Sequence, residues 1–555
     1  MDYVVGTTYD EKEKVWSGPI VKDAYDSDMT LGKAIVMQLQ KTPQKIIQIW
    51  DLTGETLTSQ QFLDYSTALA KNMLKMGVTC PDVVGLYAQH SLHVGTMMMA
   101  SFLCGTPVSG VFHGFEIDTV VEIYEKTRPK LIFCDAENYQ NALGVIDHLQ
   151  LEARIVLMTG CIEGVTNITE LLSSNEKVWD ISQFPCANLD GSATAAILCS
   201  SGTTGVPKAV MCSNQGLLHS NCYFTATCES TILFFSTMYW ASGLITLISS
   251  LLTPMLRIVP CKPYSAEYCL HLLKHYKVTH FFTTSTQAAE VVLNYTKEEV
   301  RESYKSIDSI LIGGSKVPQL IQEKLLDILS DHTQRPGLCV AYGMTEVYGG
   351  VVQSGRYPLE FKPMTEGKLF PNRKVCIVDE HNKRLGPNES GEILIFSPYI
   401  WLGYYNDPEA TAKAMHGKWL RSGDVGYFDD EGFLHVISRT KEMFKWNNFQ
   451  ICPQPIEDVL LRLPGVAEVC VFPIPDVTVT NLAACAIVRT KNEEGLNLTV
   501  DTVHKFIDKH LDNVYHMRGG VYFVDSIPKT TSDKFIRQQV YEMIKANFEL
   551  HEANK

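Results

Sequence analysis

The stretch Ala195-Ala196-Ile197-Leu198-Cys199 is followed directly by Ser200-Ser201-Gly202-Thr203-Thr204-Gly205-Val206-Pro207-Lys208. Its first part predicts a buried strand that feeds a loop rich in glycine and hydroxyl groups. Glycine reaches backbone conformations barred to other residues, so consecutive N–H groups of the loop can point at one anion. The hydroxyls and a lysine add the further donors that a triphosphate requires. The loop is not a Walker A motif, because Lys208 does not directly follow the second glycine and no Ser or Thr follows the lysine.

Length and composition are those of a large globular protein. The chain has 555 residues, of which 45% are hydrophobic and 20% charged, and this excludes a disordered, collagenous or fibrous chain. At roughly 100–200 residues per domain, we expect three or four folding units, or one large domain with a smaller one. The 48 basic and 62 acidic residues give a net charge of −14, which argues against general nucleic-acid binding.

Cysteine usage and the terminal segments favour an intracellular protein. The 16 cysteines include no CxxC pair and no cluster at zinc spacing, so we expect reduced thiols, most of them small core residues. The N-terminus has no apolar signal segment, and the most apolar stretch, residues 244–252, is too short to span a membrane. The last three residues are not a peroxisomal signal. The cytoplasm is the expected compartment, with the peroxisome as the alternative, and the oligomeric state stays open.

Short apolar runs alternate with helical patterns through the first 400 residues, which is typical of layered α/β folds. Residues 309–312 predict a second buried strand, and residues 392–396 predict a strand of a more β-rich segment. A boundary is expected near residues 437–447. Beyond it lies a compact α/β module of about 115 residues that can move as a unit, with a helix predicted at 502–511 and strands at 465–472, 483–488 and 520–524.

The loop at 200–208 resembles the signature loop of the adenylate-forming superfamily, which contains acyl-CoA synthetases, coumarate-CoA ligases, beetle luciferases and peptide-synthetase adenylation domains. Tyr342-Gly343-Met344-Thr345-Glu346 is similar to the second adenylate motif of that family. The resemblance implies that Tyr342 lies along the adenine and that Thr345 and Glu346 contact phosphate and magnesium. This fits the chemistry, because a carboxylate beside a triphosphate is useful mainly by holding Mg²⁺.

Other family blocks, which include residues 391–393 and 403–409, follow in order, and the resemblance extends from about residue 30 to residue 545. Gly313-Gly314-Ser315 resembles the turn that approaches the base, and Asp424 resembles the ribose-binding aspartate. Arg439 is similar to the arginine near the ribose and phosphate, and Lys441 falls at the family's hinge. The resemblance implies a large N-terminal domain of layered α/β subdomains with a β-rich segment and a small mobile C-terminal α/β domain. The implied bounds are an AMP-binding domain at 1–438, a hinge at 439–441 and a lid domain at 442–555.

The segment Pro528-Lys529-Thr530-Thr531-Ser532-Asp533-Lys534 resembles the one that carries the family's catalytic lysine, and Lys534 takes that position. A carboxylate that attacks an α-phosphate brings two anions together, and a positioned ammonium offsets their repulsion. The resemblance implies ATP, Mg²⁺ and CoA as cofactor and co-substrates. The expected catalytic residues are Lys534, Thr345 and Glu346. The expected metal ligands are Glu346 and Thr203, and the residues expected on the CoA side are Lys445 and Asn448. The expected nucleotide contacts are Ser200, Ser201, Gly202, Thr203, Thr204, Gly205, Lys208, Gly313, Gly314, Ser315, Tyr342, Gly343, Met344, Thr345, Asp424 and Arg439.

Several positions depart from the family pattern. Asp533 stands where Gly usually precedes the catalytic lysine, and its carboxylate could pair with Lys534. Ser438 replaces an Asp that commonly precedes the arginine. Asn448 replaces a near-universal Gly, although Asn tolerates left-handed backbone better than most residues. These departures leave open whether turnover is impaired.

The acyl-site motif differs from that of the beetle luciferases. Their His-His-Gly-Phe-Gly type segment reads Tyr239-Trp240-Ala241-Ser242-Gly243 in this chain, so Trp240 takes the place of the second His. A large aromatic side chain there could gate a fatty-acyl tunnel or close one wall of the pocket. We therefore expect Trp240, Ser242 and Gly243 to line the substrate pocket.

The expected function is that of an acyl-CoA synthetase, with resemblance to the insect luciferase-like synthetases. It would activate a medium- or long-chain fatty acid to an acyl adenylate and then transfer the acyl group to CoA. One alternative is a degenerate adenylate former that binds nucleotide without turnover, which the three departures motivate. Another is an aryl-acid ligase, which shares the ATP motifs and differs in pocket shape. A luciferin monooxygenase is disfavoured by Trp240. The expected partners are small molecules, with no nucleic acid and no transmembrane segment.

Overall fold

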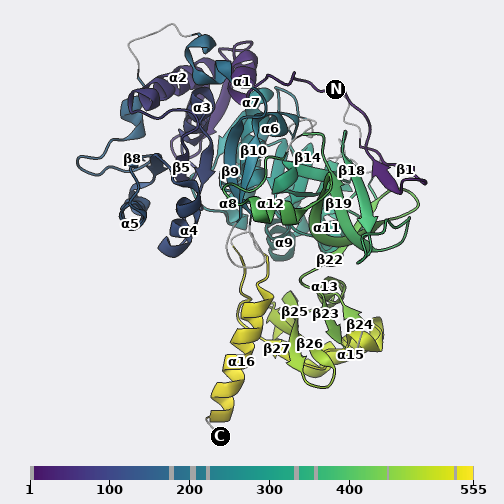
Figure 1. The fold of residues 1–555 in the computed structure, drawn as a ribbon. Coiled ribbons are helices and arrows are strands. Elements are labelled where there is room, and N and C mark those ends of the chain that lie inside the picture. The colour runs from purple at the N-terminus through teal and green to yellow at the C-terminus, as the bar shows by residue number, and fades with distance from the viewer. Residues whose placement is uncertain are drawn as a thin grey trace.

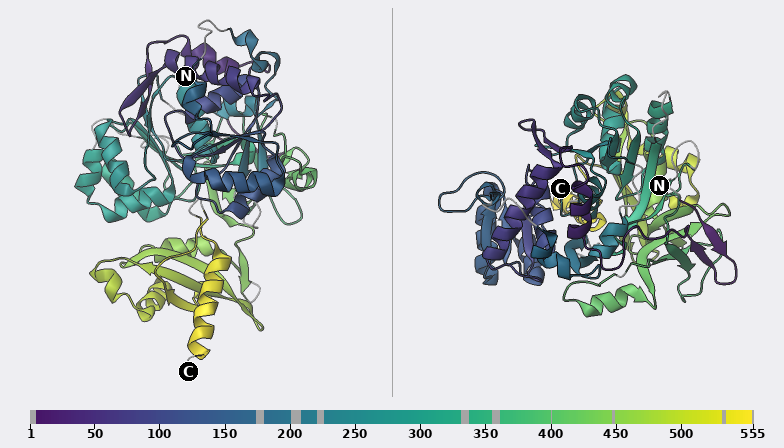
Figure 2. Two further views of the ribbon diagram at one scale, coloured as in Figure 1. Left: turned by 90° about the vertical axis from the view of Figure 1, so that its left-hand side faces the viewer. Right: turned by 90° about the horizontal axis from the view of Figure 1, so that it is seen from above.

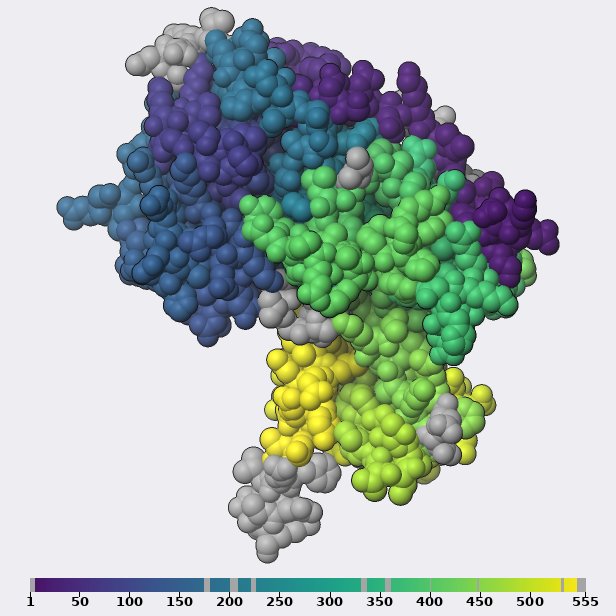
Figure 3. Space-filling model, in the orientation of Figure 1, coloured from purple at the N-terminus to yellow at the C-terminus, as the bar shows by residue number. Residues whose placement is uncertain are grey.

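The computed structural model describes residues 5–173, 180–200, 208–220, 226–330, 337–354, 361–399, 401–446, 449–530 and 534–553. Two bodies of unequal size are joined by a narrow waist, as Figures 1 and 3 show. The larger one holds residues 5–438 and is called the N-terminal region. The smaller one holds residues 442–553 and is called the C-terminal region. The mixed α/β fold expected from the sequence is confirmed, while the bounds of the domains stay a prediction.

Two mainly parallel sheets form the centre of the N-terminal region. In one sheet the parallel strands β9, β6, β5, β7 and β8 are extended by the antiparallel β10, with the order β10 (Lys208–Ser213), β9 (Thr194–Ser200), β6 (Val108–Gly110), β5 (Val84–Tyr87), β7 (Leu131–Cys134) and β8 (Arg154–Leu157). The other sheet has antiparallel strands at both edges and the order β17 (Lys368–Leu369), β16 (Gly349–Gln353), β15 (Gly337–Met344), β14 (Ser309–Gly313), β13 (His280–Thr283), β11 (Thr231–Leu233), β12 (Leu256–Val259), β3 (Ile46–Trp50) and β4 (Glu55–Thr58). The strands predicted at 195–199 and 309–312 are β9 and β14.

Helices cover both sheets, and one of them lies in the main core. Every residue of α3 (Val94–Cys104) is buried, and its Met98 shares a hydrophobic cluster with Ile47 of β3 and Leu86 of β5. A helix that is apolar all round requires such a place between two layers. The remaining helices of this region are α1 (Leu31–Leu39), α2 (Ser59–Lys75), α4 (Ile117–Thr127), α5 (Tyr139–Leu149), α6 (Asn214–Ser220), α7 (Ala241–Leu252), α8 (Ala266–His275), α9 (Ser285–Asn294), α10 (Lys297–Ser303), α11 (Gln319–Ser330) and α12 (Pro408–Ala414).

The β-rich segment expected near residue 392 is a third, antiparallel sheet. It brings the first strands of the chain beside strands that lie more than 350 residues later, since Trp16 pairs with Val375. The strands are β1 (Thr8–Asp10), β2 (Val15–Ser17), β18 (Lys374–Val378), β19 (Gly391–Phe396), β21 (Trp419–Phe428), β20 (Met415–His416) and β22 (Leu434–Arg439). β22 is the last strand before the C-terminal region, which lies below this sheet in Figure 1.

The C-terminal region contains a hairpin, a small sheet and four helices within the part of the chain that the structure describes. The hairpin joins β23 (Phe444–Trp446) to β24 (Phe449–Ile451), and the sheet has the order β25 (Val466–Asp476), β26 (Thr480–Arg489) and β27 (Gly520–Phe523). The helices are α13 (Pro453–Leu460), α14 (Glu493–Asn497), α15 (Val500–His510) and α16 (Arg537–Ala553). The three strands and the helix predicted here are present. In both Figure 1 and the left view of Figure 2, α16 begins at the face nearest the N-terminal region and runs away from it.

Two further sequence-based expectations can be compared with the structure. Within the described ranges, no helix combines the length and the apolar character that crossing a bilayer demands. The 15 cysteines in these ranges are unpaired thiols, and ten of them are buried, such as Cys104 and Cys485. Most therefore act as small core residues, as expected.

Candidate active site

The glycine-rich loop connects two antiparallel strands. Ser200 ends β9 and lies opposite Lys208, the first residue of β10. Residues 201–207, which include the expected contacts Ser201, Gly202, Thr203, Thr204 and Gly205, lie outside the described residues. Because the pairing of Ser200 with Lys208 closes the loop at its base, the position of Lys208 is fixed by the sheet.

Lys208 faces a tyrosine and a buried carboxylate. Its Nζ lies 4.7 Å from the centre of the Tyr404 ring, and the Tyr404 hydroxyl donates a hydrogen bond of 2.8 Å to Oε1 of Glu346. Burial raises the pKa of Glu346, and the Tyr404 hydrogen bond and the Lys208 charge oppose that shift. Glu346 is 6% exposed and lies in a short 3₁₀ turn, Thr345–Val347, whose first residue is half-buried. A buried carboxylate close to a lysine and a loop suited to phosphate fits a Mg²⁺ ion that a triphosphate also coordinates.

The strands β14 and β15 end side by side and bring two expected nucleotide segments together. Gly313 pairs in parallel with Ala341, the residue before Tyr342. Gly314 follows with a φ of +98° and open space at its Cβ position, so the chain turns sharply there, and Ser315 is half-buried. Gly343 is exposed, and Met344 ends β15.

Tyr342 connects this edge to the third sheet. Its hydroxyl donates a hydrogen bond of 2.7 Å to Oδ2 of Asp424, and Nε of Arg439 lies 3.3 Å from Oδ1 of the same carboxylate. Asp424 and Arg439 are direct partners in the register of β21 and β22. Burial raises the pKa of Asp424, while Arg439 and Tyr342 oppose that shift. The Tyr342 ring, the carboxylate and the guanidinium thus form one connected group.

Lys534 of the C-terminal region lies close enough to Asp424 and Arg439 of this group to interact with their charges. Burial and then the charge of Arg439 lower the pKa of Lys534 to about 8, while Asp424, Glu442 and Glu346 act in the opposite direction. The loop that carries Lys534 is closed on itself, because the Thr530 N–H donates to the Lys534 carbonyl at 2.7 Å and the Lys534 N–H donates to Oγ1 of Thr530 at 3.2 Å. Asp533 lies outside the described residues.

Arg537 links the Lys534 loop to the rest of the C-terminal region. The guanidinium donates hydrogen bonds to Glu457 of α13 and, at 2.7 Å, to the carbonyl of Val471 in β25. It also lies 3.5 Å from Glu442, one residue beyond the expected hinge. Lys534 is therefore fixed relative to the core of its own region, and a rigid rotation of that region would carry it.

The whole chain was then compared with known proteins. Residues 36–405 match the AMP-binding enzyme family, and residues 455–534 match the AMP-binding enzyme C-terminal domain. The chain belongs to the AMP-binding enzyme family. The expected membership of the adenylate-forming superfamily is thereby confirmed.

Relatives of this AMP-binding enzyme include two kinds of protein with different chemistry. It is 27% identical to a luciferin 4-monooxygenase of Photuris pensylvanica, with 90% of this chain and 91% of the relative covered. It is 26% identical to 4-coumarate–CoA ligase 2 of Petroselinum crispum, with 90% and 92% covered. The ATP-bound MatB of Rhodopseudomonas palustris has the same fold, with a TM-score of 0.79, 19% identity and coverage of 93% of this chain and 99% of MatB. The AMP-binding family match and the 4-coumarate–CoA ligase relative support the expected enzyme class, an AMP-forming acid–thiol ligase.

The residues expected to line the acid pocket lie at the start of α7. Trp240 is half-buried and precedes the helix, and the Tyr239 ring stands edge-on to it, with 4.5 Å between centroids. Ser242 is half-buried in the first turn. Gly243 is buried, and a Cβ there would lie 2.2 Å from the carbonyl oxygen of Thr237, so only glycine fits. A residue larger than glycine at position 243 would therefore disrupt the backbone arrangement next to Trp240.

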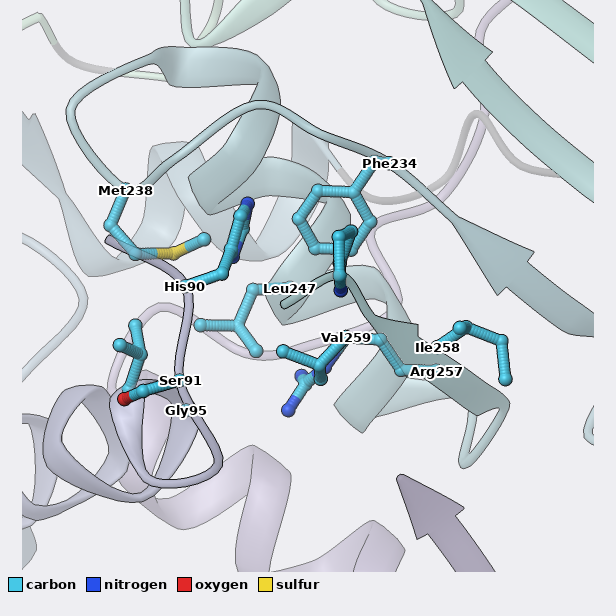
Figure 4. Close-up of a pocket in the computed structure, with 11 residues that line it drawn as sticks. His90, Ser91, Gly95, Phe234, Met238, Leu247, Arg257, Ile258 and Val259 are labelled. Atoms are coloured by element: carbon cyan, nitrogen blue, oxygen red, sulfur yellow. The ribbon is translucent and has the colours of Figure 1, made fainter. Parts of the chain in front are cut away.

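A small cavity lies behind the segment that leads to Trp240 (Figure 4). Met238 from that segment, Leu247 of α7, His90 and Arg257 are among its lining residues. Burial lowers the pKa of His90 to about 4 and that of Arg257 to about 9, so at neutral pH the imidazole is neutral and the guanidinium charged. Arg257 donates to the neutral side chains of Gln48 and Ser250. The cavity is separate from the Tyr342–Asp424–Arg439 group.

Lys441, expected at the hinge, lies at the junction of the two regions. Lys441 is exposed, and the Thr440 N–H still donates to the Gly423 carbonyl at 2.9 Å. Lys445 is exposed on β23, where its carbonyl accepts a hydrogen bond from Asn481, while Asn448 lies outside the described residues. Tyr404 was missed as a site residue, although it stands in the family block 403–409. The order of blocks gives no distances, and only folding places Tyr404 between Lys208 and Glu346.

Proposed function

We propose that this AMP-binding enzyme is an AMP-forming acyl-CoA synthetase whose acid is a medium- or long-chain fatty acid. The observation that carries the proposal is the position of Lys534 from the C-terminal region, beside Asp424, Arg439 and Glu346 of the N-terminal region. A cation held between two regions at a nucleotide-type site suits a reaction in which two anions must meet. The CoA ligases among the relatives support the reaction class.

In the first half-reaction, the acid carboxylate attacks the α-phosphate of ATP, and pyrophosphate leaves. We assign Ser200–Gly205 and Lys208 to the phosphates, Gly313–Ser315 and Tyr342–Met344 to the base, and Asp424 with Arg439 to the ribose. Lys534 offsets the repulsion between carboxylate and phosphate as the bond forms. Glu346 and Thr203 would hold Mg²⁺, and Thr345 would contact the phosphates. The ion would neutralise charge on the pyrophosphate as it leaves.

In the second half-reaction, the CoA thiol attacks the carbonyl of the acyl adenylate, and AMP leaves. We propose that the C-terminal region turns about Lys441 between the two steps, so that Lys534 withdraws and Lys445 and Asn448 face CoA. Because the acyl adenylate is a mixed anhydride that water hydrolyses, one mobile lid that covers the site in both steps protects it.

The fatty acid is the finer part of the proposal. Its support is the half-buried Trp240, packed edge-on against Tyr239 at the head of the apolar helix α7. Apolar side chains there suit an alkyl chain better than an acid that carries a second charged group. The coumarate-type relatives make an aryl acid the competing substrate.

Pyrophosphate release with ATP–Mg²⁺ tests the proposal, using fatty acids of short to long chain and cinnamates, with and without CoA. We expect release that depends on chain length, that increases with CoA and that is lost in Lys534→Ala. Release with cinnamates alone would replace the fatty acid by an aryl acid. Nucleotide binding without release across the panel would favour the non-catalytic alternative, and ATP-dependent light with a luciferin would favour a monooxygenase.

A further inference from the structure

Lys316 forms an ion pair that crosses between the two regions. It follows Gly313-Gly314-Ser315 in the chain, and its Nζ lies 3.4 Å from Oδ2 of Asp458 on α13. The Lys316 side chain is 22% exposed and that of Asp458 is 10% exposed, so the pair is largely shielded from water. Shielding makes an ion pair less sensitive to salt than a surface pair.

A second acid faces Lys316 from its own region. Glu366 is 7% exposed, and its Oε2 accepts a hydrogen bond of 2.8 Å from the Val436 N–H. Burial raises the pKa of Glu366 to about 7, and the Asp458 charge adds to that shift, while the Lys316 charge opposes it. One ammonium therefore interacts with two acids, of which one belongs to each region.

Both ends of the ion pair are attached to parts of the proposed catalytic site. On one side, the Lys316 carbonyl accepts a hydrogen bond of 2.9 Å from Ser285, which fixes the backbone just after the turn assigned to the base. On the other side, Asp458 follows Glu457, and Glu457 accepts a hydrogen bond from Arg537 near Lys534. The ion pair thus connects the turn at Gly314 with the helix that holds the Lys534 loop in place.

We propose that Lys316 is a positioning residue: its ion pair with Asp458 stabilises the orientation in which Lys534 faces Asp424 and Glu346. Glu366 belongs to the N-terminal region and stays beside Lys316 in any orientation, whereas Asp458 moves away when the C-terminal region turns. A contact made in only one of two states shifts the equilibrium toward that state. This inference rests on the proposed function, because it assigns the orientation to the adenylation step.

The first test separates the two half-reactions in Lys316→Met, Asp458→Asn, the double variant and Lys316→Arg. Adenylate formation is measured in a single turnover without CoA, and thioester formation is measured from synthetic acyl adenylate and CoA. We expect either single substitution to slow adenylate formation by about three- to tenfold, with no further loss in the double variant and recovery in Lys316→Arg. Thioester formation should be unchanged or faster. Equal losses in both half-reactions, or additive losses in the double variant, would overturn the proposal.

The second test does not depend on turnover. Trypsin cleavage after Arg439 or Lys441 reports how freely the C-terminal region moves, and Lys316→Met should increase its rate. Lys362→Met is the matched control, because Lys362 pairs with Asp429 and Glu431 inside the N-terminal region. If no acid supports turnover, the proposed function fails while this test still applies. Cleavage of Lys316→Met at the rate of the control would refute the positioning role in either case.

Discussion

Nζ of Lys208 lies 4.7 Å from the centre of the Tyr404 ring, and the same tyrosine donates its hydroxyl hydrogen bond to Glu346. One aromatic side chain thus contacts both the cation next to the glycine-rich loop and the carboxylate assigned to the metal. The block 403–405 reaches this place by pairing along β10, because the Tyr405 N–H donates to the Ala209 carbonyl at 2.7 Å.

Tyr404→Phe removes the hydrogen bond to Glu346 and keeps the ring under Lys208. A hydrogen bond to a charged group contributes about 1.5–3 kcal/mol, so KM for ATP–Mg²⁺ should rise about tenfold or more. The pKa of Glu346 should also rise, since the bond stabilises its ionised form. Initial rates at varied ATP–Mg²⁺ check this, with Tyr405→Phe as the neighbouring control. An unchanged KM would mean that Glu346 acts without Tyr404.

The charge of Lys534 predicts a pH dependence of adenylate formation. Its pKa of about 8 means that the ammonium is present below that pH and is lost above it. The apparent kcat/KM, which reports the free enzyme, should therefore fall as the pH rises through about 8, and kcat should fall only at higher pH because bound triphosphate favours the ammonium. Lys534→Arg, if active, should lack this decline. Profiles from pH 6 to 10 test the assignment, which a flat wild-type kcat/KM would contradict.

Asp424→Asn changes the same profile in a defined direction. Asp424 raises the pKa of Lys534, so a neutral amide should move the decline in kcat/KM to a lower pH. The substitution also removes the anion that accepts the Tyr342 hydrogen bond and pairs with Arg439, so weaker ATP binding should accompany the shift. If the decline stays where it is in the wild type, the two groups are not coupled electrostatically.

Gly343→Ala should destabilise the fold. A Cβ at Gly343 would lie 1.9 Å from the carbonyl oxygen of Gly349, and backbone atoms cannot move aside as a side chain can. We expect a loss of about 3 kcal/mol in the free energy of unfolding. Gly314→Ala is the comparison, since it meets no atom within 4 Å and suffers only from a φ of +98°, at about 1–2 kcal/mol. Urea unfolding of both variants measures the difference, and equal losses would count against the steric cause.

The sequence predicted strands and the order of motifs better than contacts. The runs at 195–199 and 310–312 are apolar at almost every position, so the strands β9 and β14 could be predicted from the sequence alone. Lys316, Glu366 and Asp458 show why contacts are harder. They are separated by 50 and 92 positions, no spacing rule relates them, and their proximity depends on how two regions dock. Tyr404 was visible in a family block, but its hydrogen bond to Glu346 required the sheet pairing with β10.

The register of β21 and β22 places the start of the proposed rotation next to the two residues assigned to the ribose, Asp424 and Arg439. Arg439 pairs with Asp424, and Thr440 is still bonded to Gly423, so the backbone is held to the N-terminal region almost as far as Lys441. A rotation that begins there would move the far end of α16 furthest, because this helix runs away from the N-terminal region (Figures 1 and 2). The C-terminal region would then act as a lever that pivots beside the residues assigned to the ribose. A chemical change in the ligand that barely moves the neighbouring backbone would then produce a large displacement at the far end of the C-terminal region. A fluorescent probe attached there could report each half-reaction without contacting the substrates.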